Sequence, residues 1–565
     1  MTRGRVETTV QERDVKRENL VANPSASLRV RRRVVTTSIV VIVVLLVARV
    51  SFGPLGNCLR YPNVGRVFEQ GERNRVDEPP LIYPSYSNAT IPVNIAPLNF
   101  VVQNEGSDYV TRLRGADGSE TLAFGKTASF NLGRWRDLLQ KSRGKQIEVD
   151  VFIRETSEGK KIWRAYAPFT INVSDDPVDP YLHYRLIEPG YELFNRPTLA
   201  QRHLETFDER VWFDSKAVDA RTCVNCHTFQ NRSARTFLFH ARRVGAGTIF
   251  CRDGRVEKLS PKGVNSELGA SYAAWNPVYP LVAFSTNSTF QLFHTLDKDR
   301  IDVLDATSDL ILYDPQTDKS ESICDTRDEL ETFPSWSPDG KYLYYCVSRS
   351  PYVEEQVAES SDDASKFADV YDSKNVPEIE KNKVAAPRLY DRFHYNIARR
   401  YFDPATRRFD DPEIVVDAAE MGKSALHPRV SPDGDVLVFS LCKNGGFPIW
   451  RRDADLWSVD LKSGTLRQLD ELNSEESESW SEWDSSGRWL FFSSRRDDGT
   501  FTRVYIAHYS RDGRWGVPFL LPQRDPESNR NFMKSYNLPE PTREPISVSS
   551  RRLVEASRAP NRRSR

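Results

Sequence analysis

A turn followed by an apolar run occurs four times in the second half of the chain, and this repeat constrains the fold more than any other feature. The copies begin at Trp275, Trp336, Val430 and Trp483, and the fullest turn, at residues 336–340, reads W-S-P-D-G. Pro-Asp-Gly favours a tight turn, and the apolar run after it is typical of a buried strand. A strand–turn–strand element follows each copy, which gives four strands per repeat. Such repeated units are the blades of a β-propeller.

Residues 237–255 add part of a further blade, so we expect a propeller of about six blades over residues 236–548. An acidic, polar insertion at residues 352–385 interrupts the second repeat and predicts a loop. A second acidic run, at residues 475–484, is interpreted as a solvated loop. The basic residues 549–565 predict a disordered tail.

The motif C-x-x-C-H stands at Cys223, Cys226 and His227. Two thiols at this spacing can each form a thioether with one haem, and the histidine that follows can bind iron. Zinc binding, a redox dithiol or a disulfide would also use C-x-x-C. A zinc site needs a second pair of ligands, and the sequence has no other close Cys or His pair. We therefore predict haem c, with His227 as the proximal iron ligand.

A sixth iron ligand is harder to predict. His240 lies close in sequence and directly follows the apolar run 237–239, which is also typical of a hydrogen-bonded core histidine. Methionine is scarce, with only Met421 and Met533 beyond the N-terminus. His240 is the candidate for the sixth ligand, and the core position is its alternative.

The N-terminus predicts the compartment. Four arginines within residues 29–33 precede an apolar run at 34–48 that extends to about residue 55. Length alone does not separate a membrane anchor from a signal peptide, but the long leader favours an uncleaved anchor. The positive-inside rule then puts the disordered leader, 1–33, in the cytoplasm and everything after the 34–55 anchor in the bacterial periplasm. Haem c is attached in that compartment.

Between the anchor and the propeller we expect a Pro-rich extended linker at residues 56–94 and a small β-sandwich-like domain at 95–176, with one helix near 133–141. Residues 177–235 form an irregular segment that carries the haem motif, with a helix near 199–209. The predicted fold is thus all-β beyond a single-pass membrane helix. Lysine plus arginine and aspartate plus glutamate number 79 each, so no net charge indicates a nucleic-acid partner. The other cysteines are odd in number, widely spaced and do not predict a disulfide framework.

The repeat resembles that of TolB-type periplasmic propellers. With one C-x-x-C-H ahead of the first blade, the chain resembles a bacterial group of TolB-like, WD40-like propeller proteins with a single haem motif. The resemblance covers residues 91–548 and is carried by residues 91–100, 223–227, 238–240 and 532–537. It implies the architecture and a haem-binding role for Cys223, Cys226 and His227, but no established reaction.

Three functions are compatible with these features. The leading hypothesis is a cytochrome c-like protein of the bacterial inner membrane that performs electron transfer or redox sensing through one covalent haem. Its partners would be the haem-attachment machinery and an unidentified periplasmic redox or envelope partner. The second is a protein- or glycan-binding propeller with a structural haem. The third is a haem-dependent or glycan-active enzyme.

Overall fold

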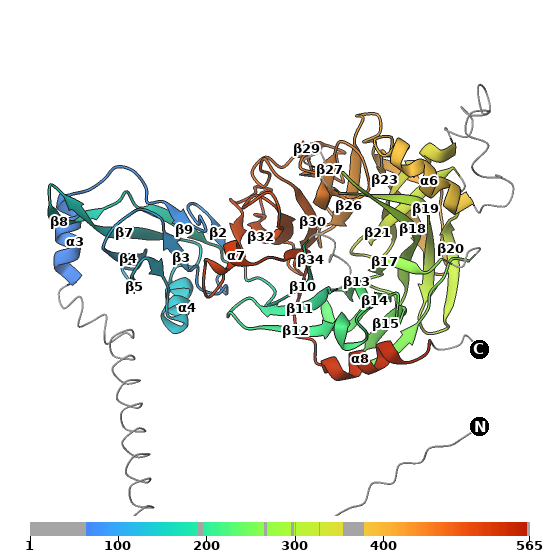
Figure 1. The fold of residues 1–565 in the computed structure, drawn as a ribbon, viewed down its shortest axis with the longest axis horizontal. Helices are drawn as coiled ribbons and strands as arrows, with labels where there is room; N and C mark the ends of the chain where they lie inside the picture. The colour runs from blue at the N-terminus through green and yellow to red at the C-terminus, as the bar shows by residue number, and fades with distance from the viewer. Residues whose placement is uncertain are drawn as a thin grey trace, which may run out of the picture. The chain divides into compact units, whose positions relative to one another are not determined.

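The computed structural model describes residues 64–189, 196–264, 268–294, 299, 301–326, 328–353 and 378–561 (Figure 1). The described residues from Gln70 onward belong to one compact unit. The predicted leader, 1–33, and membrane segment, 34–55, lie outside the described residues. Within the described ranges, no helix is long and apolar enough to cross a membrane. Strands dominate these ranges, which confirms an all-β fold.

The stretch 56–94, predicted as an extended linker, contains regular structure. It holds α3 (Val64–Arg73), β1 (Ile82–Tyr83) and β2 (Thr90–Ile91). Its polar composition concealed a helical spacing of apolar residues at Val64, Val67 and Phe68. The linker prediction is therefore wrong for these three elements.

Residues 95–176 form, with β1 and β2, two sheets and a helix. One sheet contains β1, β3 (Phe100–Val102) and β6 (Thr127–Ala128). The other contains β2, β9 (Phe169–Val173), β7 (Gln146–Ser157), β4 (Asp108–Gly115), β5 (Glu120–Phe124) and β8 (Lys160–Ala165). The helix α4 (Leu132–Lys141) begins after Asn131, whose side chain accepts hydrogen bonds from two backbone N–H groups of the first turn.

Six further sheets are the blades of a propeller. Blade one contains β13 (Cys223–Gln230), β14 (Ser233–Arg242), β15 (Gly247–Arg252) and β16 (Arg255–Leu259). Blade two contains β17 (Ala270–Trp275), β18 (Val282–Phe293), β19 (Ile301–Asp314) and β20 (Lys319–Cys324). Blade three contains β21 (Glu329–Trp336), β22 (Tyr342–Arg349), β23 (Asn396–Asp403), β24 (Arg408–Phe409) and β25 (Glu413–Val416). Blade four contains β26 (Ser424–Val430), β27 (Val436–Cys442), β28 (Asp455–Asp460) and β29 (Leu466–Gln468). Blade five is β30 (Glu478–Trp483), β31 (Trp489–Ser494), β32 (Arg503–His508), β33 (Phe519–Leu520), and blade six is β34 (Ser535–Thr542), β10 (Tyr181–Ile187), β11 (Thr198–His203), β12 (Glu209–Asp214).

One strand of each blade lies at the centre. The inner strands β13, β17, β21, β26, β30 and β34 contact one another in this order, and β34 contacts β13, which closes the ring. Figure 1 shows these six strands around a common centre. The described residues therefore form a closed six-bladed propeller.

The sequence repeat is explained by the turn after each inner strand. The Ser337 hydroxyl donates to Asp339 and accepts the N–H of Tyr342, while Gly340 adopts φ +70°. A Cβ on Gly340 would lie 2.5 Å from the Asn276 side chain, so this turn requires glycine. The Trp336 indole donates to the carbonyl of Ala274 in the preceding blade, 3.2 Å away. The repeat thus specifies both the turn and the contact between neighbouring blades.

Blade six joins the two ends of the propeller sequence. β34 pairs antiparallel with β10, and the side chains of His183 and Thr542 are hydrogen-bonded although 359 residues separate them. Residues 177–235, predicted as a separate haem-motif segment, instead supply β10, β11, β12 and β13, so the propeller begins at Tyr181 and not at 236. The helix predicted near 199–209 is replaced by β11. No local signal was available because these strands lack the W-S-P-D-G turn.

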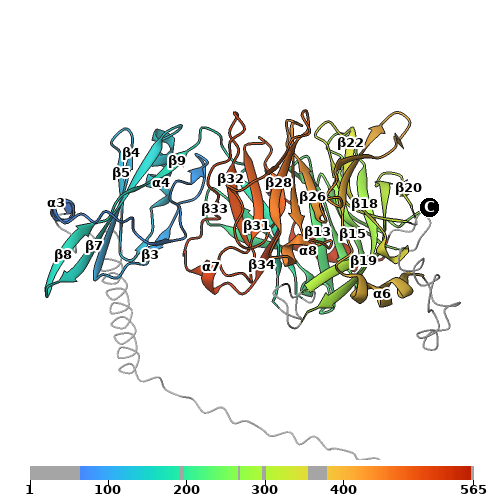
Figure 2. The same ribbon diagram turned by 90° about the horizontal axis from the view of Figure 1, so that it is seen from above.

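Helices α6, α7 and α8 and two short 3-10 helices lie on the outside of the described blades. The 3-10 turns are η2 (Ser215–Ala217) and η4 (Pro448–Trp450), and α7 (Ser528–Asn531) is a single turn. The helix α6 (Glu378–Leu389) lies beside β18 and β19, part of the region predicted as a loop (Figure 2). The predicted disordered tail, 549–565, contains α8 (Ser550–Arg558), which packs on blades one and six through Leu553 and Val554. Its arginine-rich composition concealed this apolar pair.

Candidate functional site in the central channel

The inner strand of every blade carries a β-bulge with one residue in the left-handed backbone conformation. The register shifts in β13, β17, β21, β26, β30 and the β10–β34 pair. The six left-handed residues, here called the bulge ring, have φ between 38° and 56° and are Cys226, Tyr272, Phe333, His427, Trp480 and Leu538. Such a conformation costs about 1–3 kcal/mol per residue. Its presence in all six blades marks a constraint of the architecture.

The bulge in β13 reorients the C-x-x-C-H motif. Between Asn225 and His227 the partner strand advances by one residue while β13 advances by two, so Cys226 is the extra residue. In an uninterrupted strand His227 would share a face with Cys223 and Asn225. The extra residue turns His227 to the opposite face. Cys226 itself faces the centre of the propeller, where it lines two cavities.

His227 is fully buried without a hydrogen-bond partner. Its side chain is 0% exposed, and neither ring nitrogen forms a hydrogen bond with any described residue. Trp212 and Phe229 lie edge-on to the imidazole, with ring centroids 6.3 and 5.9 Å away. Burial and the Arg185 charge lower the pKa of His227 to about 3, so the ring is neutral at physiological pH. A neutral imidazole with an available nitrogen is the form that binds metals.

The contact between His227 and Glu540 is not an ion pair at neutral pH. Nε2 of His227 lies 4.0 Å from Oε2 of Glu540. Burial, followed by the Glu482 carboxylate, raises the pKa of Glu540 to about 8, so this carboxyl group is mostly protonated. Both members of the pair are therefore uncharged near pH 7, and Glu540 leaves the imidazole nitrogens free to bind another group.

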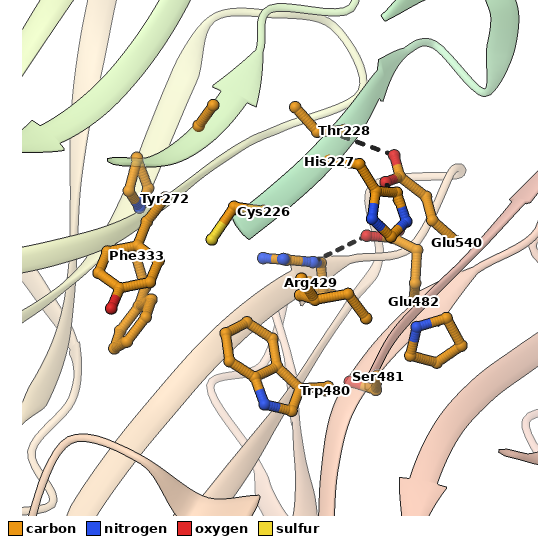
Figure 3. Close-up of a pocket in the computed structure, with 14 residues that line it drawn as sticks. Cys226, His227, Thr228, Tyr272, Phe333, Arg429, Trp480, Ser481, Glu482 and Glu540 are labelled. Atoms are coloured by element: carbon orange, nitrogen blue, oxygen red, sulfur yellow. Dashed lines mark hydrogen bonds and ion pairs between the residues drawn. The ribbon is translucent and has the colours of Figure 1, made fainter. Parts of the chain in front are cut away.

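The buried carboxyl groups close to His227 accept hydrogen bonds from neighbouring residues. Glu540 accepts the backbone N–H of Phe229 at 2.8 Å. Glu482 accepts from Arg232 at 2.9 Å and from Arg429 at 2.8 Å, which joins blades one, four and five. Charge-assisted hydrogen bonds of this kind are strong and rigid. Figure 3 shows Arg429, Glu482 and Glu540 next to the His227 ring.

These acids include residues that the sequence pattern placed in a solvated loop. Part of the run 475–484 is the inner strand β30, in which Glu478 and Glu482 occur, and Asp484 follows directly. Glu478 and Asp484 are 0% and 1% exposed. The solvated-loop prediction is wrong for these residues because the segment is an inner strand, and the two arginines that contact Glu482 are distant in sequence.

Two cavities share members of the bulge ring. The axial cavity has about 530 Å³ of empty space and is lined by all six inner strands, among others by Cys226, His227, Phe333, Arg429, Trp480 and Glu540 (Figure 3). The arginine cavity has about 610 Å³ of empty space and is lined among others by Arg185, Asn225, Cys226, Arg242, Phe447 and Trp450. Both are lined by Tyr272, Trp480 and Leu538 as well as by Cys226. The Cys226 thiol is therefore accessible from either cavity.

Cys223 lies beside the arginine cavity. It is buried at 5% exposure, directly opposite Arg242 on the neighbouring strand, and on the same strand face as Asn225. Cys223 lines neither cavity, but both of these neighbours line the arginine cavity. The two motif thiols are free and are not joined in a disulfide. Burial raises the pKa of the Cys226 thiol, which keeps it protonated at neutral pH.

The other predicted ligands lie elsewhere. His240 is hydrogen-bonded through Nδ1 to Thr248 at 3.0 Å and lines neither cavity. This position fits the core-histidine alternative and gives no support to a sixth ligand. Met421 and Met533 are exposed. A histidine that sequence reasoning did not single out, His427, belongs to the bulge ring, stacks on Trp480 at 3.6 Å between centroids and has no hydrogen-bond partner for either nitrogen among the described residues.

No known protein family and no curated protein matches the sequence. Among solved structures, the chain is similar to TolB from Acinetobacter baumannii, with 12% identity, a TM-score of 0.36 and coverage of 73% of this chain and 85% of that one. It is also similar to Kuenenia stuttgartiensis hydrazine synthase (13% identity, TM-score 0.28, coverage 50% and 63%). The propeller domain of the Trilobed protease from Pyrococcus furiosus gives 10% identity, a TM-score of 0.29 and coverage of 68% and 96%. The propeller assignment rests on the strand pairing of this chain and not on these scores.

Proposed function

We propose that this chain is a periplasmic, membrane-anchored propeller protein that carries one haem c in its central channel. Cys223 and Cys226 would hold the porphyrin through thioethers, and His227 would bind the iron. The observation that carries the proposal is His227, whose two ring nitrogens are buried and unpartnered at the wall of a cavity next to a free thiol. An unsatisfied buried polar group costs about 1–3 kcal/mol. A bound metal would satisfy one of the two nitrogens and reduce that cost.

Haem would supply one-electron redox chemistry, so the protein would transfer electrons or sense redox state. The chain's own contribution would be to fix and shield the group. Trp212 and Phe229 hold the His227 ring in one orientation, and burial keeps it neutral. The aromatic members of the bulge ring, Tyr272, Phe333 and Trp480, would give the group a largely apolar surrounding, since all three are buried and line the axial cavity.

Covalent attachment of haem requires a particular position of the Cys223 side chain. Two thioethers require both sulfur atoms at one edge of the porphyrin, so the Cys223 side chain must reach the arginine cavity that its neighbours Asn225 and Arg242 already line. Attachment also requires the periplasmic haem machinery. The arginines at 29–33 ahead of the apolar run 34–55 support that compartment and an anchor in the inner membrane.

Covalent attachment has a direct test, because thioethers survive denaturation. The full chain, expressed with the haem-attachment machinery, should stain for haem peroxidase activity on a denaturing gel and give a reduced-minus-oxidised cytochrome spectrum. The double change Cys223→Ala with Cys226→Ala should abolish the stain. Cys251→Ala, at a buried cysteine of β15 outside the motif, is the matched control and should retain it. Wild-type protein with stoichiometric zinc and no haem overturns the proposal.

A second candidate function is favoured by a further cavity. The mouth is a polar cavity next to the axial cavity, with about 1080 Å³ of space that includes open solvent. It is lined among others by Arg232, Arg429, Arg543, Trp275, Trp336 and Pro338. Arginine and aromatic side chains around a concave site favour binding of a protein segment or an envelope glycan. In that case the haem would be structural. A redox-inactive holoprotein that still binds isolated envelope fractions, and loses binding on Arg543→Ala, would favour this candidate.

A further inference from the structure

Two segments outside the regular blades line the arginine cavity. The first is the outer part of the β18–β19 hairpin, residues 287–293 and 301–308, here called the ribbon. Its two strands pair only with each other within the described chain, because β17 pairs with β18 no further than Thr286 and β20 pairs with β19 no further than Leu310. A two-stranded ribbon is marginally stable by itself, so its position depends on its neighbours. Its lining residues are Thr289, Gln291 and Val303.

The second segment is the connection between β27 and β28, residues 443–454, here called the blade-four loop. It contains η4, and it lines the cavity with the apolar side chains of Phe447, Ile449 and Trp450. Gly445 and Gly446 precede these side chains, and Gly445 has φ +87°, a conformation that favours glycine. Small residues at such a position can absorb the backbone change of a hinge. The loop thus places bulky apolar side chains directly after a possible hinge.

The ribbon and the blade-four loop meet at a buried ion pair. Nη1 of Arg451, in the loop, lies 3.1 Å from Oδ1 of Asp302, in the ribbon, and these residues are 7% and 3% exposed. Beside this pair, the Asp299 carboxylate accepts the backbone N–H of Arg452 at 2.8 Å. Removal of one partner of a buried pair leaves the other charge without its counter-ion. The contact between the two segments is therefore sensitive to a single substitution.

The base of the ribbon is held by a different part of the chain. The Asp305 carboxylate accepts from the Tyr395 hydroxyl at 3.0 Å, and the Asp305 carbonyl accepts from the Tyr352 hydroxyl at 2.9 Å. Asn382 of α6 donates to the carbonyl of Ala306 at 2.8 Å. All three donors belong to the connection between β22 and β23, so the base stays fixed when the contact with the blade-four loop is broken.

We infer that the ribbon and the blade-four loop are the two halves of a gate that admits a ligand to the arginine cavity, and that the ion pair between Asp302 and Arg451 closes it. The gate goes beyond the proposed function, because it does not depend on which ligand the cavity holds. Cys226 lines this cavity and is 7% exposed, so its thiol reports the opening. The competing route to Cys226 runs through the mouth and the axial cavity.

The rate of alkylation of Cys226 in the haem-free full chain measures the opening. Iodoacetamide is added under native conditions, and peptide mass mapping gives the rate at each cysteine. Asp302→Asn keeps the size of the side chain and removes the charge that holds Arg451, so Cys226 should react at least about tenfold faster. Asp435→Asn is the matched control: it removes an exposed blade-four carboxylate, 2.8 Å from Lys462, and should leave the rate at the wild-type value.

A second cysteine separates opening of the gate from unfolding. Cys251 is buried in β15 and lines neither cavity, so it should stay unmodified while Cys226 reacts in Asp302→Asn. Reaction of both cysteines at one rate would mean that the whole chain unfolds, which overturns the gate. A Cys226 rate in Asp302→Asn equal to that of the control also overturns it, and assigns entry to the mouth.

A double variant tests the ion pair itself. Arg451→Gln should accelerate alkylation of Cys226 as Asp302→Asn does, because either change breaks the same contact. The chain with both changes should then react no faster than the faster single variant, since a contact can be removed only once. If the two accelerations multiply instead, the two residues act separately and do not close a gate together, which overturns the inference.

Discussion

The axial cavity and the arginine cavity share the bulge ring, but they differ in whether their buried charges have partners of opposite sign. In the wall of the axial cavity, Glu482 is held by Arg232 and Arg429, so positive and negative groups meet. In the arginine cavity, no aspartate or glutamate is among the lining residues of the described chain, and the Asp305 carboxylate interacts with Arg242 only from outside that lining. A compensated network stabilises the fold by itself. An uncompensated pair is stabilised only when an anionic group binds. This difference distinguishes the wall of the axial cavity, which is structural, from the arginine cavity, which is a ligand site.

The largest contrast is between two histidines of blade one. In the haem-loaded chain, His227→Leu should abolish the low-spin spectrum, because it removes the proposed iron ligand. His240→Leu should keep that spectrum, since His240 lines neither cavity. Visible spectra of the two purified variants decide the matter. A low-spin spectrum that survives His227→Leu and disappears in His240→Leu reverses the assignment.

Breaking the compensated network should cost stability. Glu482→Ala would leave Arg232 and Arg429 without their carboxylate, and loss of one partner of a buried pair costs about 3–5 kcal/mol. Urea denaturation of the haem-free chain measures the change. Glu471→Ala removes an exposed acid paired with Arg467 and should change stability by about 0.5 kcal/mol or less. Equal midpoints for the two variants would falsify the view that this network stabilises the fold.

An acid next to this network should give a pH-dependent loss of stability. Burial, followed by the nearby Asp179, raises the pKa of Asp484 to about 7, against about 3.9 in an unfolded chain. Between about pH 4 and 7 the folded state therefore keeps a proton that the unfolded state has lost, so stability falls as pH rises through this window. Three pKa units correspond to about 4 kcal/mol at most.

The measurement for Asp484 is a series of urea melts from pH 4 to 8. Asp484→Asn removes the titrating group but keeps an oxygen for the N–H groups of Arg488 and Trp489, so its stability should fall less with pH than that of the wild type. Asp512→Asn, at an exposed carboxyl group whose pKa is lowered by a hydrogen bond from Ser510, is the control. Parallel curves for wild type and Asp484→Asn contradict the argument.

The sequence predicted the propeller because its signal is local. The turn at 336–340 and the apolar run after it lie within a dozen residues, so four blades could be identified directly. Blade six could not, because β34 and β10 meet from opposite ends of the chain. The α8 helix was not predicted for a similar reason. Its apolar side chains are few, and the strands that they pack against, β12 and β16, are distant in sequence.

The site was predicted in part. Cys223, Cys226 and His227 follow from a motif, whereas Arg185, Arg242, Glu482 and Glu540 have no pattern of their own and meet only in the closed ring. One signal was present in the sequence and was missed. In blades two to five the bulge-ring residue stands three positions before the repeat begins, as at Phe333 before Trp336. Blade one lacks the repeat, so this spacing does not identify Cys226, which only the structure places in the bulge ring.

The smallest change in stability is expected from a substitution in the uncompensated pair, and the sign of that change tests the comparison. In the haem-free chain, Arg185→Met removes a buried charge that has no counter-ion among the described residues, at the loss of two hydrogen bonds to neutral acceptors. Replacement of such a group by an apolar side chain of similar length should leave stability unchanged or raise it by about 1 kcal/mol. Urea melts measure the difference.

The same substitution at a compensated arginine should act in the opposite direction. Arg451 is as long and more deeply buried, but it contacts Asp302 at 3.1 Å, and Asp302 is 3% exposed. Arg451→Met would leave that carboxylate buried with only His294 beside it, 2.7 Å away, and should lower stability by about 3 kcal/mol. A comparable loss in Arg185→Met would mean that the Arg185 charge is already balanced in the haem-free chain, and the arginine cavity would then belong with the structural wall.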